Sequence, residues 1–170
     1  MKMKNYLLTL LLISTSIHAM DQDVHLVPFD FAKHSNAIHD VFSQIIDEND
    51  IENLLILKNK EQITIQVLER SYPTPHSNPH NEVLGAIAYQ TRNFPEATKT
   101  FINALAIRAK YQHNRYGHLL LHHIESIPTT KPHLISLHPH NDTISFYQEL
   151  GYTYQEGRPP VHIPSMHKII

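Results

Sequence analysis

The chain has 170 residues, of which 41% are hydrophobic and 18% charged, as expected for one soluble globular domain. A formal net charge of -2 gives no basic surface of the kind that nucleic-acid binding requires, so no nucleic-acid partner is expected. Cysteine is absent, which excludes disulfides, thiolate zinc sites and cysteine nucleophiles, whereas histidine occurs 15 times.

Residues 1–19 have the order of a secretory signal peptide. Lys2 and Lys4 precede a short apolar run, and small and polar residues follow it. The run is shorter than the ~20 residues of a membrane-spanning helix, so no span is expected in the mature protein. The sequence therefore predicts a signal peptide over 1–19, a domain over 20–170, and a periplasmic or secreted protein. The alternative is a cytoplasmic protein whose translation starts at Met20.

The first part of the domain predicts two strands separated by two helices, and then a loop. By apolar spacing, these are a strand over 24–30, helices over 34–47 and 50–60, a strand over 62–69 and a loop over 71–81. Ser35 or Asn36 could cap the first helix. A buried strand is the competing interpretation of the second helix, because its apolar run is short.

The second part of the domain predicts alternating strands and helices. These are strands over 82–90 and 100–107 joined by a longer connection, a helix from about 116 to 126, a strand over 133–139, a helix over 142–151 and a final strand over 161–170. Gly151 is placed to close the last helix at its C-terminus. This alternation predicts an α/β domain with a mixed sheet and at least one parallel β-α-β unit.

The stretch YQHNRYGHLLLHHIE, residues 111–125, suggests two different chemistries. A glycine-containing loop that enters a helix presents unpaired backbone N–H groups and the positive end of the helix dipole, which suit an anion. His118, His122 and Glu125 share one helix face at a spacing that could hold a metal ion. No HExxH motif is present, and the polar side of a surface helix is an ordinary place for histidine, so no metal is predicted.

Four stretches, in order, resemble the GCN5-related N-acetyltransferase (GNAT) superfamily. They are VLGAIAY (83–89), NALAIRAKYQHNRYGHLLLHHIE (103–125), HLISLHPHNDTISFYQELGYTY (133–154) and SMHKII (165–170). The resemblance implies a GNAT-like acyl-CoA N-acyltransferase fold, in which helices flank a central mixed sheet. It further implies transfer of acetyl from acetyl-CoA to a primary amine, on a small molecule or a peptide, by direct attack through a tetrahedral intermediate.

The resemblance also implies which residues bind acetyl-CoA. They are Leu105, Ala106, Ile107, Gln112, Asn114, Arg115, Tyr116, Gly117, His118 and Asn141. A backbone N–H of the first three would stabilise the oxyanion, and the next six form the pyrophosphate loop. The family's loop has a glycine where this chain has Arg115, so the chain departs from the pattern there. Tyr147 corresponds to the tyrosine that commonly protonates the departing thiolate.

The general base stays open at this stage. Family members often carry a glutamate on the fourth strand, where this chain has Asn103 and Ala104, and an amide takes no proton at neutral pH. A water chain, His138 at the end of the fifth strand, or positioning alone would have to serve. The alternatives are therefore a catalytically weak or inactive binding module of the same fold, and an exported histidine-rich metal-binding protein. A monomer or a homodimer fits the sequence equally.

Overall fold

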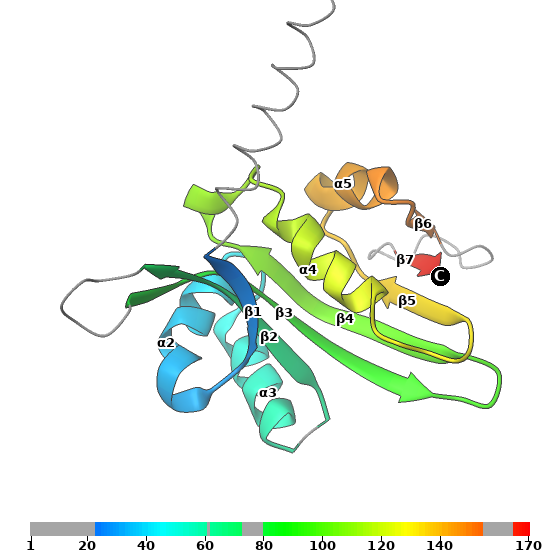
Figure 1. The fold of residues 1–170 in the computed structure, drawn as a ribbon, viewed down its shortest axis with the longest axis horizontal. Helices are drawn as coiled ribbons and strands as arrows, with labels where there is room; N and C mark the ends of the chain where they lie inside the picture. Colours follow the sequence, from blue (N-terminus) through cyan, green and yellow to red (C-terminus); the bar gives the residue numbers. More distant parts are fainter. Residues whose placement is uncertain (1–22, 61, 73–79, 155–164) are drawn as a thin grey trace, which may run out of the picture.

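The computed structural model describes residues 23–60, 62–72, 80–154 and 165–170, which form a seven-stranded sheet with helices on both faces (Figure 1). The strands are β1 (Val24–Pro28), β2 (Thr64–Tyr72), β3 (His80–Asn93), β4 (Thr98–Ile107), β5 (His133–Leu137), β6 (Thr153–Tyr154) and β7 (Met166–Ile169). The helices are α2 (Phe31–Phe42), α3 (Glu48–Asn59), α4 (Tyr116–Glu125) and α5 (Ile144–Glu149), with short 3-10 turns η1 (Ala109–Tyr111) and η2 (Asn141–Thr143). The predicted signal peptide, most of the predicted proline-rich loop and the start of the predicted final strand lie outside the described residues. No helix in the described ranges is long and apolar enough to cross a membrane.

The sheet is mixed, as the sequence predicts. Its strand order is β1-β2-β3-β4-β5-β7-β6, and every neighbouring pair is antiparallel except β4 and β5. Helix α4 connects these two parallel strands, which makes β4-α4-β5 the predicted β-α-β unit. The α/β fold class and the mixed sheet are therefore confirmed.

Two apolar cores lie on opposite faces of the sheet, because alternate residues of a strand point to opposite sides. On one face, α2 and α3 pack against small side chains that include Ala86 and Ala104. On the other face, α4 and α5 pack against larger side chains that include Leu84 and Ile87. Figure 1 shows α2 and α3 apart from α4 and α5, with the sheet between the two pairs.

Several predicted boundaries are wrong, and α2 is the clearest case. It begins at Phe31, because the Asp30 carboxylate accepts hydrogen bonds from the N–H groups of Ala32 (2.8 Å) and Lys33 (3.2 Å). The predicted caps Ser35 and Asn36 lie inside this helix. The helix also ends at Phe42, five residues before the predicted end at 47.

The strands and the last helix also differ from the prediction. Strand β2 runs on to Tyr72, and β3 and β4 are longer than predicted, so that only residues 94–97 connect them. The sequence missed the short strand β6. Helix α5 is shorter than predicted, but Gly151 does follow it in the left-handed conformation, with φ 84°.

Gly85 lies on β3 opposite Ile107, the last residue of β4. A Cβ at this position would lie 2.6 Å from the Ala106 carbonyl oxygen, and backbone cannot give way as a flexible side chain can. We expect Gly85→Ala to lower the free energy of unfolding by about 1–3 kcal/mol, the usual range for overpacking. Chemical denaturation measures the effect, with exposed Arg92→Ala on the same strand as the control. An unchanged unfolding midpoint in Gly85→Ala would contradict this assignment.

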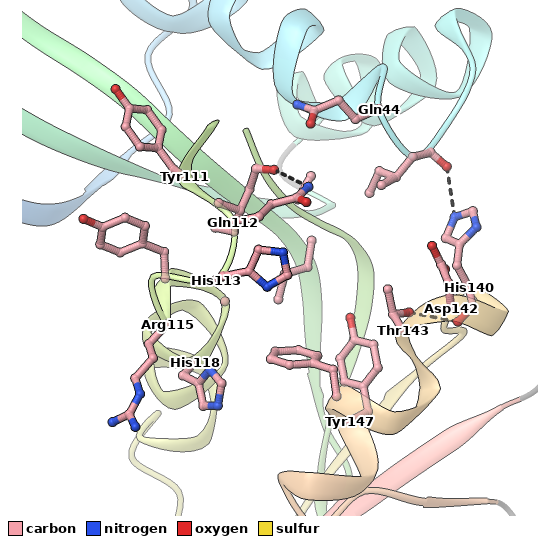
Figure 2. A pocket seen from close by; sticks show the side chains of 17 residues that line it. Gln44, Tyr111, Gln112, His113, Arg115, His118, His140, Asp142, Thr143 and Tyr147 are labelled. Carbon is pink, nitrogen blue, oxygen red and sulfur yellow. Dashed lines mark hydrogen bonds between the residues drawn. The ribbon is translucent and has the colours of Figure 1, made fainter. Parts of the chain in front are cut away.

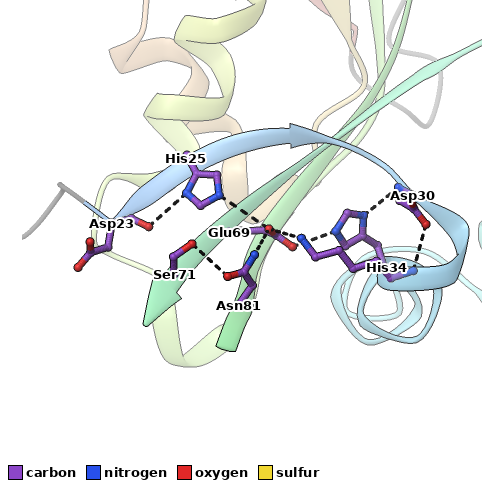
Figure 3. Close-up of polar contacts among 8 residues, drawn as sticks. Asp23, His25, Asp30, His34, Glu69, Ser71 and Asn81 are labelled. Atoms are coloured by element: carbon purple, nitrogen blue, oxygen red, sulfur yellow. Dashed lines mark hydrogen bonds and ion pairs between the residues drawn. The ribbon is translucent and has the colours of Figure 1, made fainter. Parts of the chain in front are cut away.

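A buried polar cluster joins α2 to the sheet (Figure 3). Glu69 on β2 and His34 on α2 are 1% and 2% exposed, and the His34 Nε2–H donates to Glu69 Oε1 at 2.9 Å. The other ring nitrogen of His34 accepts the Asp30 backbone N–H at 2.8 Å, which fixes the tautomer. Lys33 and Asn81 donate to Glu69 Oε2 at 2.7 and 3.0 Å. Every oxygen of the buried carboxylate therefore has a partner.

Candidate functional site

The parallel pairing of β4 with β5 stops before β4 ends. The last paired residues are Ile102 and Leu137, whereas β4 continues to Ile107 and stays paired with β3 except at Asn103, where the register shifts. The two parallel strands therefore diverge, and the extension of β4 has one edge without a partner strand among the described residues. Such an edge presents backbone N–H and C=O groups that can bind an extended ligand.

Two residues of this extension direct their N–H groups toward the open edge. The Arg108 N–H donates to the Leu84 carbonyl of β3 at 2.9 Å, and successive residues of a strand alternate in the side to which they point. The backbone N–H of Ala106 is therefore directed toward β3, whereas the N–H groups of Leu105 and Ile107 are directed toward the opening. Of the three predicted oxyanion donors, Leu105 and Ile107 have the orientation that the role requires.

A cavity of about 600 Å³ lies at this opening (Figure 2). It is lined by Gln44, Ile45, Leu105, Ala106, Ile107, Tyr111, Gln112, His113, Arg115, Tyr116, Gly117, His118, His140, Asp142, Thr143, Phe146 and Tyr147. These residues come from the α2–α3 connection, the end of β4, the loop into α4 and the first turn of α4, and the β5–α5 connection with α5. The volume lies within the usual range of ligand pockets, about 300–1,000 Å³.

The loop into α4 ends in an open helix N-terminus. No side chain in the described ranges caps this helix, so the N–H groups of Tyr116, Gly117 and His118 in its first turn keep their hydrogen-bonding capacity. Together with the helix dipole, they form a site that favours an anion. Asn114 shapes the loop from outside the cavity, because its side-chain amide donates to the Tyr111 and Gln112 carbonyls, both at 3.3 Å.

Arg115, which stands where the family pattern has a glycine, has a backbone conformation that favours glycine. Its backbone is left-handed, with φ 61° and ψ 11°, and it occupies the N-cap position of α4. The nearby His113 is also left-handed, with φ 66°. The loop thus keeps a backbone that suits glycine while its residues carry side chains, and this conformation is less favourable for residues with a Cβ.

We expect Arg115→Gly to raise the free energy of unfolding by about 1 kcal/mol, because glycine removes the left-handed strain. Arg115→Ala is the matched control, since it removes the same guanidinium and keeps a Cβ in the left-handed conformation. Equilibrium denaturation distinguishes the two variants. A glycine variant no more stable than the alanine variant would contradict the strain.

Glycine fits position 117 because of packing, and not because of a positive φ. Its φ is not positive, but a Cβ there would lie 3.1 Å from the Cζ atom of Phe146 on α5. The ring of His118 also lies edge-on to Phe146, with ring centroids 5.2 Å apart. Gly117 therefore lets α5 approach the first turn of α4, which brings Tyr147 to the cavity.

Arg70 on β2 contacts two tyrosines of the segment that leads into α4. It donates a hydrogen bond to the Tyr116 hydroxyl. Its guanidinium lies 5.7 Å and 5.9 Å from the ring centroids of Tyr111 and Tyr116, within the range of cation-π contacts. Both tyrosines line the cavity, so β2 helps to fix the wall next to the open helix N-terminus.

Tyr147 lies at the centre of the cavity wall, and Figure 2 shows its hydroxyl directed into the cavity. The side chain is buried, with 7% exposed, and burial raises the pKa of Tyr147 to about 12. No group in the described ranges forms a hydrogen bond with its hydroxyl. A protonated phenol at this position can therefore donate its proton to a ligand.

A family model identifies the chain. The model of the acetyltransferase (GNAT) family matches residues 44–152, which is more than half of the chain. The chain belongs to the GNAT family. No curated protein sequence matches it at a significant level.

Solved structures of GNAT proteins share the fold. They include an acetyltransferase from Trypanosoma brucei (14% identity over 82% of this chain and 99% of that one, TM-score 0.56). Another is PaiA N-acetyltransferase from Thermoplasma acidophilum in complex with coenzyme A (15% identity, 85% and 98%, TM-score 0.52). A third is Naa50 from Arabidopsis thaliana in complex with the bisubstrate analogue CoA-Ac-MVNAL (15% identity, 86% and 98%, TM-score 0.57). At these identities the likeness shows the fold alone.

The GNAT domain places most of the predicted site residues around one cavity. Tyr147 and all the predicted coenzyme A residues except Asn114 and Asn141 line it. His138, one of the candidates for the base, does not line it, and its ring packs against Phe101 with centroids 5.4 Å apart. The functional roles of the lining residues remain predictions.

Sequence reasoning missed part of the cavity wall. The missed lining residues are Gln44, Ile45, Tyr111, His113, His140, Asp142, Thr143 and Phe146. Most of them lie on connections, where neither periodicity nor a motif marks them. His140 had no distinguishing signal among 15 histidines, yet its Nε2 bonds to the Ile45 carbonyl at 3.0 Å and joins two connections across the cavity.

Two residues on the predicted histidine face of α4 contact other elements of the protein. Glu125 accepts a hydrogen bond from Lys168 of β7 at 2.8 Å, and His118 packs against Phe146. Among the residues with described positions, no three histidine or acidic side chains come together in a metal-binding arrangement.

Proposed function

We propose that this GNAT protein is an N-acetyltransferase that transfers acetyl from acetyl-CoA to a primary amine. One observation carries the proposal: the open edge of β4, the uncapped N-terminus of α4 and the Tyr147 hydroxyl all border the same cavity. The edge of β4 could bind an extended arm, the N-terminus of α4 could bind a pyrophosphate, and the Tyr147 hydroxyl could protonate a thiolate. Acetyl-CoA presents all three complementary groups in one molecule.

The pyrophosphate would bind at the N-terminus of α4. The N–H groups of Tyr116, Gly117 and His118 supply donors, and the helix dipole favours the negative charge. Arg115 lines the same end of the cavity and can add a charge-assisted contact that glycine could not. The replacement of the family glycine by Arg115 thus exchanges backbone freedom for positive charge.

The thioester would lie between β4 and Tyr147. The amine nitrogen attacks the carbonyl carbon, a C–N bond forms, and the oxygen becomes an oxyanion that the N–H of Leu105 or Ile107 can stabilise. The C–S bond then breaks, and the departing thiolate takes the hydroxyl proton of Tyr147. The proton of the attacking nitrogen leaves to solvent, because β4 offers Asn103 and Ala104 where the family often has a carboxylate.

Similar structures support the choice of cosubstrate. The Thermoplasma protein was solved with coenzyme A, and the Arabidopsis protein with an analogue that joins CoA, acetyl and a peptide. Both have the same fold as this chain, although their low identity leaves the acceptor of this chain open. Small amines and peptide amines are accordingly both included in the test.

The test is acetyl-CoA-dependent release of free thiol with a panel of primary amines, together with calorimetric titration of acetyl-CoA. We expect binding and amine-dependent release. The missing carboxylate on β4 favours a second candidate, a binding module of the same fold, which would bind acetyl-CoA without amine-dependent release. A failure to bind acetyl-CoA would contradict both candidates.

The compartment is a separate proposal, which rests on the signal-like pattern of residues 1–19. We propose that the protein is exported. Since acetyl-CoA is a cytosolic metabolite, an exported enzyme would have to act where a cell supplies this donor. Mass spectrometry of the native N-terminus in fractionated cells tests the export. A chain that begins at Met1, or one that begins at Met20 in the cytoplasm, would contradict it.

A further inference from the structure

The two ends of the cavity differ in chemistry. Figure 2 shows Arg115 and His118 toward one end, and Gln44, His140 and Asp142 toward the other, with Tyr147 between them. The first end offers N–H donors and a guanidinium. If acetyl-CoA occupies that end and the open edge of β4, the acceptor enters from the second end, whose polar groups therefore bear on the choice of acceptor.

Gln44 presents an oxygen to the second end rather than its N–H groups. Its Nε2 donates to the carbonyl oxygens of Asp40 (3.1 Å) and Val41 (3.2 Å) in the last turn of α2, which precedes it. Both partners are acceptors, so the amide orientation is fixed and its two N–H bonds are used. The Gln44 Oε1 atom keeps its lone pairs for a ligand.

His140 and Thr143 have likewise used their donors. The Nε2 of His140 faces the Ile45 carbonyl at 3.0 Å, which requires the proton on that nitrogen and leaves a lone pair on Nδ1 of the neutral ring. The hydroxyl of Thr143 donates to the His140 carbonyl at 2.9 Å, and its oxygen can then only accept. The neutral polar side chains at this end therefore offer lone pairs and no free N–H or O–H.

Asp142 adds a negative charge to the same wall. It is the one carboxylate among the described residues that line the cavity. It is exposed and makes no hydrogen bond or ion pair with any residue whose position is described. A wall of acceptors with one unpaired carboxylate complements an ammonium group, which has three donors and no acceptor.

We propose that the acceptor is a diamine or polyamine, whose second, non-reacting ammonium group binds to Asp142 and the acceptors around it. This inference rests on the proposed acetyltransferase function. The reacting nitrogen must be neutral when it attacks, so a carboxylate that held this nitrogen as a cation would stabilise the ground state and slow the reaction. A second ammonium stays charged throughout, and Asp142 can bind it in the ground state and the transition state alike.

The first test compares 1,4-diaminobutane with n-butylamine in acetyl-CoA-dependent thiol release by the full-length chain. We expect kcat/KM for the diamine to exceed that for the monoamine by about 2–5-fold, as an ion pair with an exposed carboxylate implies. Asp142→Asn should remove most of this preference and leave the affinity for acetyl-CoA unchanged. Glu149→Gln, an exposed carboxylate of α5 that does not line the cavity, is the matched control and should keep the preference.

The second test measures binding without turnover, so that it stands even if no amine is acetylated. Calorimetric titration of the CoA-loaded protein should show tighter binding of the diamine than of n-butylamine, and Asp142→Asn should abolish the difference. Equal binding of the two amines, or a preference that survives in Asp142→Asn, would overturn the inference. An Asp142-dependent diamine preference in binding without thiol release would support the inference and contradict the acetyltransferase function.

Discussion

Tyr147→Phe is expected to lower kcat for acetyl transfer by about 100-fold or more, while the affinity for acetyl-CoA stays unchanged. Phenylalanine keeps the ring that packs between Phe146 and Tyr152 and removes only the hydroxyl that faces the cavity. Loss of a positioned acid typically lowers rates by about 10²–10⁴-fold. Steady-state kinetics with calorimetry separates the chemical step from binding. Unchanged turnover in the variant would show that another group protonates the thiolate.

The pH dependence gives an independent check on Tyr147. Burial raises its pKa to about 12, so the hydroxyl keeps its proton at neutral and moderately alkaline pH. Its capacity to act as an acid should therefore persist until the pH approaches about 12. In the wild type, a decline in kcat near neutral pH that disappears in Tyr147→Phe would contradict this assignment. Tyr72→Phe, which alters a hydroxyl outside the cavity, is a suitable control.

Glu69→Ala is expected to lower the free energy of unfolding by about 1–3 kcal/mol, the usual cost of leaving a buried donor without its acceptor. The substitution leaves the buried His34 Nε2–H without its acceptor and removes the contact of Asn81 as well. Chemical denaturation measures the loss. Glu52→Ala, an exposed carboxylate of α3, is the control and should stay within about 0.5 kcal/mol of the wild type. Equal stabilities of the two variants would contradict the role of the cluster.

Two carboxyl groups with lowered pKa values, those of Glu69 and Glu82, predict that the fold is sensitive to acid. Burial alone would raise the pKa of Glu69, but hydrogen bonds from Lys33 and His34 and the positive charge of Lys33 outweigh burial and hold this pKa below its ordinary value. For Glu82 burial also acts upward, and hydrogen bonds from Lys110, Tyr111 and Tyr72 lower its pKa to about 2. Groups with depressed folded-state pKa values stabilise the fold above their unfolded value of 4.5, and this contribution is lost as the pH falls through the folded value. Stability should therefore decline as the pH falls from about 4.5 toward about 2, and less steeply in Glu69→Ala.

The sequence predicted those elements whose apolar pattern and terminal residues agree. Helix α4 is an example, because Leu120, Leu121 and Ile124 face the core and the helix begins at the predicted residue. The start of helix α2 was predicted too late, because its first turn is exposed. The apolar spacing therefore begins after the residue at which the helix, capped by Asp30, starts. The residues at which β3 and β4 run beyond their predicted ranges were not predicted as strand, because they are polar. Thr91, for example, lies in such a part of β3 and pairs with Thr100 through its side chain.

The candidate site was predictable only where a motif marks it. The loop pattern around Gln112 and Gly117 led to the uncapped helix N-terminus, and the Phe-Tyr pair led to Tyr147. The acceptor end was not predictable, because it arises where the connections after α2 and after β5 meet through the contact of His140 with Ile45. Nothing local in the sequence specifies that contact. The left-handed conformation of Arg115 was equally hidden, since arginine rarely adopts it.

The most direct test of the proposed acetyl-CoA site is a titration of the ¹⁵N-labelled protein with acetyl-CoA, followed by amide shifts and hydrogen exchange. We predict saturable shifts and new protection at the N–H groups of Leu105 and Ile107, which face the opening, and at the first turn of α4. The N–H of Ala106, already directed toward β3, should gain no comparable protection. An absence of binding, or changes that spare both β4 and the start of α4, would contradict the account.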